Sequence, residues 1–561
     1  MTFKKFFSQK EKQIRITIIA ILFLFIFSFG IYLALNTPPT SDEFTFVASG
    51  YSYWKTADFR MNTEQPPLIK LFNTIPLLAM NLNLPTNHTS WQKAQLFKED
   101  GFYKQFVFHS NAHKKERMLF FSRLFNIFLA LALGAVILKW ATELFGPWAG
   151  IFALAIYSLE PTRIAYTSLF MMDVGFSLFA TLSFYTLWKF LNKPTITNWS
   201  YCAISFGLAQ LTKHTAIMLF GIYPAILIAY LLAGHVKTPK KFQSKITFLF
   251  MSYFGIALVG LLFINAIYGF QGTFQTTQQM FDNDQNIDKT IYSEEKLFGN
   301  TYAKFIAQKI PQILPYHFVK GLGYVLNEAK SPRTTYLFGK TSENGFWHYY
   351  LLSFLAKTPI AILILLTAAI TYFAASKKSW NNEIILILPI IIYVILFSIN
   401  QKQIGIRHIL QIYPLIIIFI SRITNSKWCK KTTGKIIITL LLLFALIELI
   451  TAFPDYISYA NAIVGVNNTY KYFADSNVDM SQNIDKAINF IKANPQTKAA
   501  ISTTDILNEY VEFTSPNECK PGLIIADSYA LNANKKYAWL KCKKPIQRLG
   551  RTLFVYNLTK C

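Results

Sequence analysis

Long apolar runs recur along the chain and leave few ways for it to fold. The first run, at residues 14–35, is long enough to cross a bilayer, because ~20 helical residues at ~1.5 Å rise cover the hydrocarbon core. The chain is 53% hydrophobic, which a soluble protein of 561 residues rarely is. About eleven membrane spans are predicted, although the fifth is short for a full crossing. They lie at 14–35, 117–138, 147–160, 168–190, 201–212, 214–233, 246–268, 347–375, 383–399, 407–424 and 436–453.

Basic residues indicate how these spans are oriented. The chain has 55 Lys and Arg against 29 Asp and Glu, a formal net charge of +26. Many of them stand in short loops between apolar runs, which is typical of the cytoplasmic side of a membrane protein rather than of a nucleic-acid-binding surface. An inside N-terminus places all the clusters on that side, so we predict a multi-pass protein of the plasma or inner membrane with no nucleic-acid partner. The clusters are 4–15, 189–193, 237–245, 377–378 and 422–435.

Three longer segments are then expected on the outer face. They are the loops 36–116 and 269–346 and the tail 454–561, while residues 1–453 as a whole form the predicted transmembrane catalytic domain.

The tail alternates apolar and polar residues and is predicted to be a small α/β domain. Strands are expected at Lys498 to Ser502 and Leu523 to Ala526, and a helix at Ile484 to Ala493. Cys519, Cys542 and Cys561 share this tail, which allows one disulfide.

Acidic residues at the start of the first outer loop are candidates for chemistry. Asp42 and Glu43 follow the first span by a few residues, and Glu64 stands ahead of a Pro-Pro pair in the same loop. A carboxylate at a membrane interface can act as a general base if burial tunes its pKa. The plainer interpretation is a pair of surface carboxylates at a helix start, with Ser41 or Asp42 as the N-cap.

A further carboxylate, Asp173, stands near the start of a later span. Ionisable groups in a membrane region are costly, so Asp173 is a functional candidate by default. The structural alternative is an interfacial ion pair between Asp173 and Arg163.

Basic residues recur at the same predicted face of the membrane. Arg123, Lys213, Lys357 and Arg407 lie at or near span ends, and Lys70 follows the Pro-Pro pair. Interfacial anchoring explains any one of them. Their convergence on one face better suits a phosphate carried by a lipid, which Arg and Lys bind well.

Motifs for other chemistries are missing from the sequence. The chain has no Walker loop and no Rossmann fingerprint, which disfavours ATP-driven transport and NAD chemistry. A Cys-x-x-Cys pair is also absent, so no metal ligands are assigned. Glu64 and His317 together would be the weakly supported site of a divalent metal.

Several short segments match a known pattern in their order along the chain. The chain resembles the polyprenyl-phosphate-dependent glycosyltransferases of the GT-C fold, within them the dolichyl-phosphate-mannose protein mannosyltransferases and the aminoarabinose lipid A transferases. The matching segments are Asp42-Glu43, Asn62 to Leu68 with Lys70, Leu144 to Pro147, Asp173, Gly207 to Lys213, Tyr336 to Gly339 with Gly345 to Trp347, Lys357 to Pro359, Gly405 to Leu410 with Tyr413-Pro414, and Ala474 to Asp479 with Gln482.

The resemblance implies a sugar on a phosphorylated polyprenol as donor, transfer on the outer face, and Asp42 as the catalytic base. The chain departs from the pattern in two places. It has Glu64-Gln65 where relatives often have Glu-Lys, and Asp479-Met-Ser-Gln482 where many have Asp-Trp-Gly-Gln. Both departures leave the sugar and the acceptor open.

Together these features predict a mainly α membrane protein, a GT-C-like bundle of about eleven helices with long outer loops and a small α/β domain. Its expected function is hexosyl or pentosyl transfer, mannosyltransferase-like, to a hydroxyl of a protein, glycolipid or glycan. The alternative is a lipid-linked sugar transporter without transferase activity, which would be expected to carry its polar site near the midplane. Expected catalytic residues are Asp42, Glu43 and Asp173, and expected donor-phosphate or substrate ligands are Glu64, Lys70, Arg123, Lys213, Lys357 and Arg407.

Overall fold

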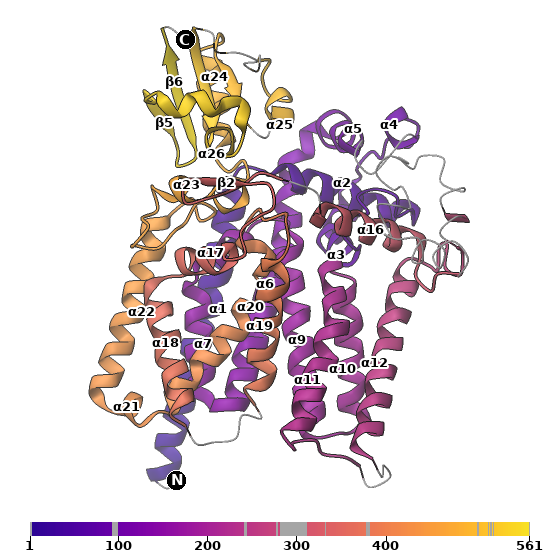
Figure 1. The fold of residues 1–561 in the computed structure, drawn as a ribbon, viewed down its shortest axis with the longest axis vertical. Coiled ribbons are helices and arrows are strands. Elements are labelled where there is room, and N and C mark those ends of the chain that lie inside the picture. Colours follow the sequence, from indigo (N-terminus) through magenta and orange to yellow (C-terminus); the bar gives the residue numbers. More distant parts are fainter. Residues whose placement is uncertain are drawn as a thin grey trace.

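A helical bundle carries a small sheet domain at one end (Figure 1). The N-terminus lies at the opposite end of the bundle, and the C-terminus lies in the sheet domain. The computed structural model describes residues 3–92, 99–239, 244–276, 279–280, 311–330, 333–376, 382–501, 504–513, 515, 519 and 521–559.

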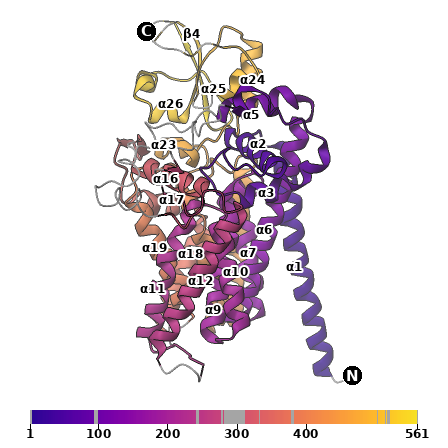
Figure 2. The same ribbon diagram turned by 90° about the vertical axis from the view of Figure 1, so that its right-hand side faces the viewer.

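The bundle is built from apolar helices, with α1 running along one edge (Figure 2). Exposed apolar side chains on α1, α12 and α22, such as Leu24, Phe250 and Leu443, suit a surface that faces lipid. The bundle helices are α1 (Phe3–Asn36), α6 (Lys115–Phe145), α7 (Pro147–Leu159), α9 (Met172–Asn192), α10 (Ile196–Gln210), α11 (Leu219–Leu232), α12 (Lys245–Ile267), α18 (Ile360–Ala374), α19 (Ile384–Ser398), α20 (Ile412–Ser421) and α22 (Thr432–Ala452).

Every predicted apolar run overlaps a helix, but the number of full spans differs from the prediction. Within the described residues, 6 helices are long and apolar enough to cross a membrane. A seventh span would be α17 (Tyr349–Lys357) with α18, which are bent by 114°. The bend follows from Pro359, which cannot continue a helix and holds Thr358 in an extended conformation. Because α7, α19 and α20 have only 10–17 residues, eleven complete crossings are not confirmed.

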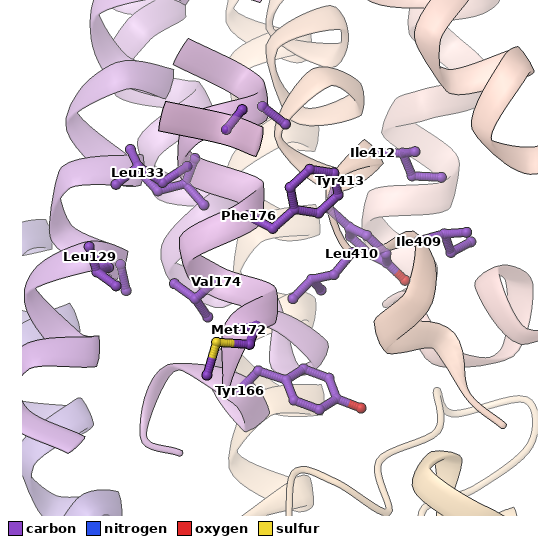
Figure 3. Packing of buried hydrophobic residues seen from close by; sticks show 14 of the residues in the cluster. Leu129, Leu133, Tyr166, Met172, Val174, Phe176, Ile409, Leu410, Ile412 and Tyr413 are labelled. Atoms are coloured by element: carbon purple, nitrogen blue, oxygen red, sulfur yellow. The ribbon is translucent and has the colours of Figure 1, made fainter. Parts of the chain in front are cut away.

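The core of the bundle surrounds α20. All residues of this helix are buried, and it packs against α6, α7, α18 and α19. Figure 3 shows buried apolar side chains of this core, among them Phe176 of α9, Leu410, which precedes α20, and Tyr413 in the first turn of α20. A helix that is apolar on every side can face lipid or be enclosed by other helices, and the complete burial of α20 shows that it is enclosed at the centre of the bundle.

The tail from α24 onward forms a small α/β domain around a four-stranded sheet. The strand order is β3 (Lys498–Ala500), β4 (Gly522–Asp527), β6 (Leu553–Leu558) and β5 (Gln547–Leu549), with β3 and β4 parallel and the other pairs antiparallel.

Successive side chains along β4 and β6 point to opposite faces of the sheet, and both faces are apolar. Ile525 and Val555 pack against α24 (Ile484–Ala493), while Ile524 and Phe554 pack under α26 (Ser528–Asn532). The helix and the two strands predicted from the sequence are therefore confirmed, whereas β5, β6 and α26 were not predicted. Cys519 is disulfide-bonded, Cys542 is free, and Cys561 lies outside the described residues.

The segment between α22 and α24 packs into the bundle rather than into the sheet domain. Tyr456, Tyr459, Phe473 and Val478 belong to the bundle core, and the separate core of the sheet domain begins at Ile484. This junction therefore couples the two parts of the chain.

Asp479 gives the junction a predicted pH dependence. Its Oδ1 accepts a hydrogen bond from Ser481 N at 2.7 Å, and its Oδ2 is buried. Burial, followed by the Asp527 carboxylate, raises the pKa of Asp479 to about 7. The folded protein therefore holds this proton more tightly than the unfolded chain, and the resulting stability is lost as pH rises from about 4 through 7.

We expect Asp479→Asn to remove this loss. Between pH 5 and pH 8 the variant should gain roughly 2–3 kcal/mol over the wild type, measured by unfolding at both pH values. Parallel stability curves for the two proteins would contradict the assigned titration.

Candidate active site

A cavity of about 500 Å³ opens at the end of the bundle that carries the sheet domain. Its walls come from α2 (Ser41–Thr56), the loop that follows it, the starts of α9 and η4 (His214–Met218), α16 (Tyr316–Lys330), and η5 (Ile406–Ile409) with the loop before it. The charged residues that line it are Asp42, Glu64, Asp173, Glu328, Lys213, Arg333, Lys402 and Arg407.

Asp42 stands in the first turn of α2. The N-cap of this helix is Thr40, not Ser41 or Asp42 as expected, and Thr40 forms a capping box with Glu43. The Asp42 carboxylate is thereby free to face the cavity, where its Oδ2 lies 3.3 Å from Arg407 Nη1. Its side chain remains 42% exposed, so a substrate can reach it.

Arg407 is held in place by the junction of the tail. Asn477 Oδ1 accepts a hydrogen bond from Ile406 N at 2.9 Å, and Ser476 Oγ donates to Ile404 O at 2.9 Å. A side chain at Gly405 would collide with Ser476 and the backbone of Asn477. Because residue 405 is a glycine, the loop before η5 can pack closely against Ser476 and Asn477, and this packing places Arg407 next to Asp42.

Asp173 forms a second ion pair in the cavity. Its Oδ1 lies 2.7 Å from Lys213 Nζ, and both side chains are largely buried. The expected alternative, a pair between Asp173 and Arg163, is wrong. Arg163 instead donates hydrogen bonds to the carbonyls of Tyr157 and Ser158.

Glu64 is the lining carboxylate that has no ion pair or hydrogen bond with the described residues. Burial, followed by the nearby Asp42 carboxylate, raises its pKa, while Lys402 and Arg407 act in the opposite direction. A partly desolvated carboxylate of this kind is a better proton acceptor than one in water.

The cavity also contains charged residues that the sequence did not single out. Lys402 pairs with Glu328 of α16, and Arg333 Nη2 lies 2.5 Å from Asp475 Oδ2. Lys402 could have been predicted from its position, because it stands only a few residues before the Gly405 to Leu410 segment that contains Arg407. Glu328 and Arg333 lie within the predicted second outer loop, 269–346, and belong to no motif.

Glu43 and Arg123 lie outside the cavity lining and bind each other. Arg123 Nε and Nη2 lie 2.7 and 2.8 Å from the two Glu43 carboxylate oxygens, and both side chains are buried. Arg123 also donates to the carbonyls of Ala34 and Thr37 at the end of α1. Phe170 N donates to Glu43 Oε1 at 2.8 Å. This pair therefore joins α1, α2, α6 and the start of α9.

Lys70 and Lys357 also bind protein groups rather than line the cavity. Lys70 Nζ donates to Tyr53 Oη and to the backbone carbonyl of Asn62, which supports the loop that carries Glu64. Lys357 Nζ donates to the carbonyls of Ile457 and Asn477 at 2.6 and 2.5 Å. Both are buried, so they fix the backbone around the site.

A metal at Glu64 and His317 finds no support in the described residues. His317 does not line the cavity, and among the residues described no group of three or more His, Cys, Asp or Glu side chains is arranged to hold a metal ion.

Two segments of the chain match models of known families. Residues 116–264 match the dolichyl-phosphate-mannose-protein mannosyltransferase model, and residues 336–494 match the Alg9-like mannosyltransferase family model. The chain matches none of the curated proteins compared with it by sequence.

Solved structures similar to the chain are membrane glycosyltransferases. The archaeal oligosaccharyltransferase AglB from Archaeoglobus fulgidus, in complex with an inhibitory peptide and a dolichol-phosphate, is 11% identical with a TM-score of 0.51 and covers 98% of this chain and 75% of that chain. The same organism's oligosaccharyltransferase tethered to an acceptor peptide gives a TM-score of 0.50 at 11% identity, with the same coverage. ArnT from Cupriavidus metallidurans bound to undecaprenyl phosphate gives 0.49 at 11% identity, covering 97% and 98%. The chain is therefore a membrane protein with the GT-C fold that its sequence motifs predict.

Proposed function

We propose that this chain transfers a sugar from a polyprenyl-phosphate carrier to an acceptor hydroxyl, and that the charged cavity is the active site. The observation that carries the proposal is the meeting of Asp42, Glu64 and Asp173 with Arg407 and Lys213 in one cavity at the end of a GT-C bundle. The two mannosyltransferase family matches and the lipid phosphates named in similar structures support the same reaction class.

The reaction has a simple balance in this cavity. The acceptor oxygen forms a bond to the anomeric carbon of the sugar while the bond from that carbon to the phosphate oxygen breaks. The acceptor proton passes to a carboxylate, for which Asp42 is the accessible candidate, and the polyprenyl phosphate leaves with the electron pair. A phosphate is a good leaving group, so a base and a cationic clamp suffice.

Phosphate binding is assigned to the cations that already line the cavity. Arg407, Lys213 and Lys402 each pair with a carboxylate there, so their charges are compensated before a donor arrives. The Arg407 contact with Asp42, at 3.3 Å, is the longest of the three. Donor binding would therefore draw Arg407 toward phosphate and release Asp42 as a base.

The proposed site faces the extracytoplasmic side. The basic segment that contains α21 (Lys427–Lys430) lies at the same end of the bundle as the N-terminus, opposite the end that carries the sheet domain (Figure 1). An excess of basic residues in short loops is typical of the cytoplasmic side.

Arg407→Lys should weaken donor binding although the charge is kept. Arg meets phosphate with two parallel hydrogen bonds, whereas Lys offers one point charge. We expect an affinity loss of about 10-fold for Lys and up to about 100-fold for Ala, because a hydrogen bond to a charged group contributes about 1.5–3 kcal/mol. Donor affinity and thermal stability are measured on the same preparations. Unchanged affinity with lower stability would make Arg407 a structural partner of Asp42.

Reconstitution tests the function itself. Purified protein is placed in proteoliposomes with undecaprenyl phosphate that carries a radiolabelled sugar, together with membrane proteins or glycolipids as acceptors. Label that moves onto an acceptor supports the transferase. Label that only crosses the bilayer while still attached to its carrier would establish the transporter instead.

A further inference from the structure

Three residues on one wall of the cavity carry buried polar atoms that have no hydrogen-bond partner among the described residues. Gln65, His214 and Thr215 all line the cavity. Gln65 Oε1, His214 Nδ1 and Thr215 Oγ1 are buried, and none of them makes a hydrogen bond with a described residue. A buried polar atom left unpaired costs about 1–3 kcal/mol, so three on one wall call for an explanation.

The wall is rigid, because two segments distant in the chain are joined there. His214 Nε2 lies 3.1 Å from the backbone carbonyl of Thr63, and the ring packs edge-on against Phe318 with centroids 4.8 Å apart. A side chain at Gly321 of α16 would collide with both partners of the His214 contact. The imidazole is thus held from three sides, and Nδ1 is its remaining polar edge.

The geometry also sets the hydrogen-bonding character of the wall. The Thr63 carbonyl only accepts, so Nε2 must carry the hydrogen, and in the neutral ring Nδ1 is then an acceptor. Gln65 Oε1 is a second acceptor, and the Thr215 hydroxyl can act either way. Acceptors require a ligand that donates. Ionised phosphate oxygens accept only, whereas sugar hydroxyls donate and accept.

We propose that Gln65, His214 and Thr215 form a subsite that binds hydroxyl groups of the transferred sugar, a role that rests on the proposed function. The subsite lies beside Lys213 and Glu64, which are the chain neighbours of His214 and Gln65. In this arrangement the sugar hydroxyls contact uncharged residues, while the phosphate contacts the neighbouring cations.

The test separates the sugar from its carrier. Binding of purified full-length protein to undecaprenyl phosphate alone is compared with binding to undecaprenyl-phosphoryl mannose, glucose and aminoarabinose. The variants are Thr215→Val, Gln65→Leu and His214→Gln, in which the glutamine amide can still reach the Thr63 carbonyl. Thr367→Val is the matched control, because its hydroxyl bonds only within α18 on an exposed face.

We expect the wild type to bind at least one sugar-bearing carrier more tightly than the bare carrier. Each subsite variant should reduce this preference by roughly 5–10-fold, the loss of about one hydrogen bond, without changing affinity for the bare carrier. The control should change neither value.

Three results would overturn the subsite. The first is an equal loss of affinity for the bare carrier, which would mean that these residues bind phosphate. The second is no change in any variant, which would mean that only water contacts these side chains. The third is a wild type that binds no sugar-bearing carrier more tightly than the bare carrier. Transfer is assayed separately, so a sugar preference without turnover would refute the proposed reaction while leaving the subsite intact.

Discussion

Replacing Asp42 with Asn is expected to reduce turnover by roughly 10²–10⁴, the loss typical of a positioned general base. The amide keeps the size and the first-turn position of the side chain in α2 but cannot accept the acceptor proton. Donor binding should persist, since the cations that line the cavity are unchanged. Sugar transfer and donor affinity are measured on protein shown to be folded.

Asp58→Asn is the matched control for this experiment. Asp58 lies in the same loop, outside the cavity lining, and pairs with Arg60 at the protein surface. A surface ion pair contributes about 0–1 kcal/mol, so the control should keep its turnover. Near-normal turnover of folded Asp42→Asn would transfer the role of base to Glu64 or Asp173.

Replacing Arg123 with Met is expected to have the largest effect on stability. The change leaves the Glu43 carboxylate buried without its cation and removes the donors to the end of α1. Breaking a buried pair on one side costs about 3–5 kcal/mol. We expect a large fall in the thermal midpoint and in the yield of folded protein.

Lys139→Met serves as the comparison, because Lys139 pairs with Glu143 at 3.9 Å on an exposed surface of the same helix. Its midpoint should hardly move. If Arg123→Met instead kept its stability and lost donor affinity, Arg123 would return to the phosphate site predicted for it from the sequence.

The bundle and the tail were largely predictable because they depend on local patterns. A run such as 246–268 can only be a buried or lipid-facing helix, and the short unbroken apolar run at Leu523 to Ala526 is typical of a strand with two covered faces. The bend at Pro359 was not predicted, because the apolar run 347–375 continues on both sides of this proline and was predicted as a single span.

The pairings in the site could not be predicted in the same way. Asp42 and Arg407 are 365 residues apart, and the packing of η5 against the junction at Asn477 and against α17 and α19 brings them together. Glu43 has the same chemistry as Asp42 and follows it directly. One step along the α2 helix turns its carboxylate away from the cavity and into the protein, where Arg123 binds it.

Cavity residues that belong to no sequence motif could not be predicted for the same reason. Lys402 lies in the loop before η5 and Glu328 lies in α16, and neither residue belongs to a recognisable motif. The wall of Gln65, His214 and Thr215 exists because a histidine ring joins two segments that are distant in the chain.

The most direct measurement of the central claim is the stoichiometry of transfer by the purified protein. The sugar and the carrier are labelled separately, and glycosylated acceptor and free undecaprenyl phosphate are counted over a single turnover. The account predicts one free undecaprenyl phosphate for each sugar attached to an acceptor, with both products formed roughly 10²–10⁴ times more slowly by folded Asp42→Asn. Intact labelled carrier recovered from the opposite leaflet, with no glycosylated acceptor, would contradict it.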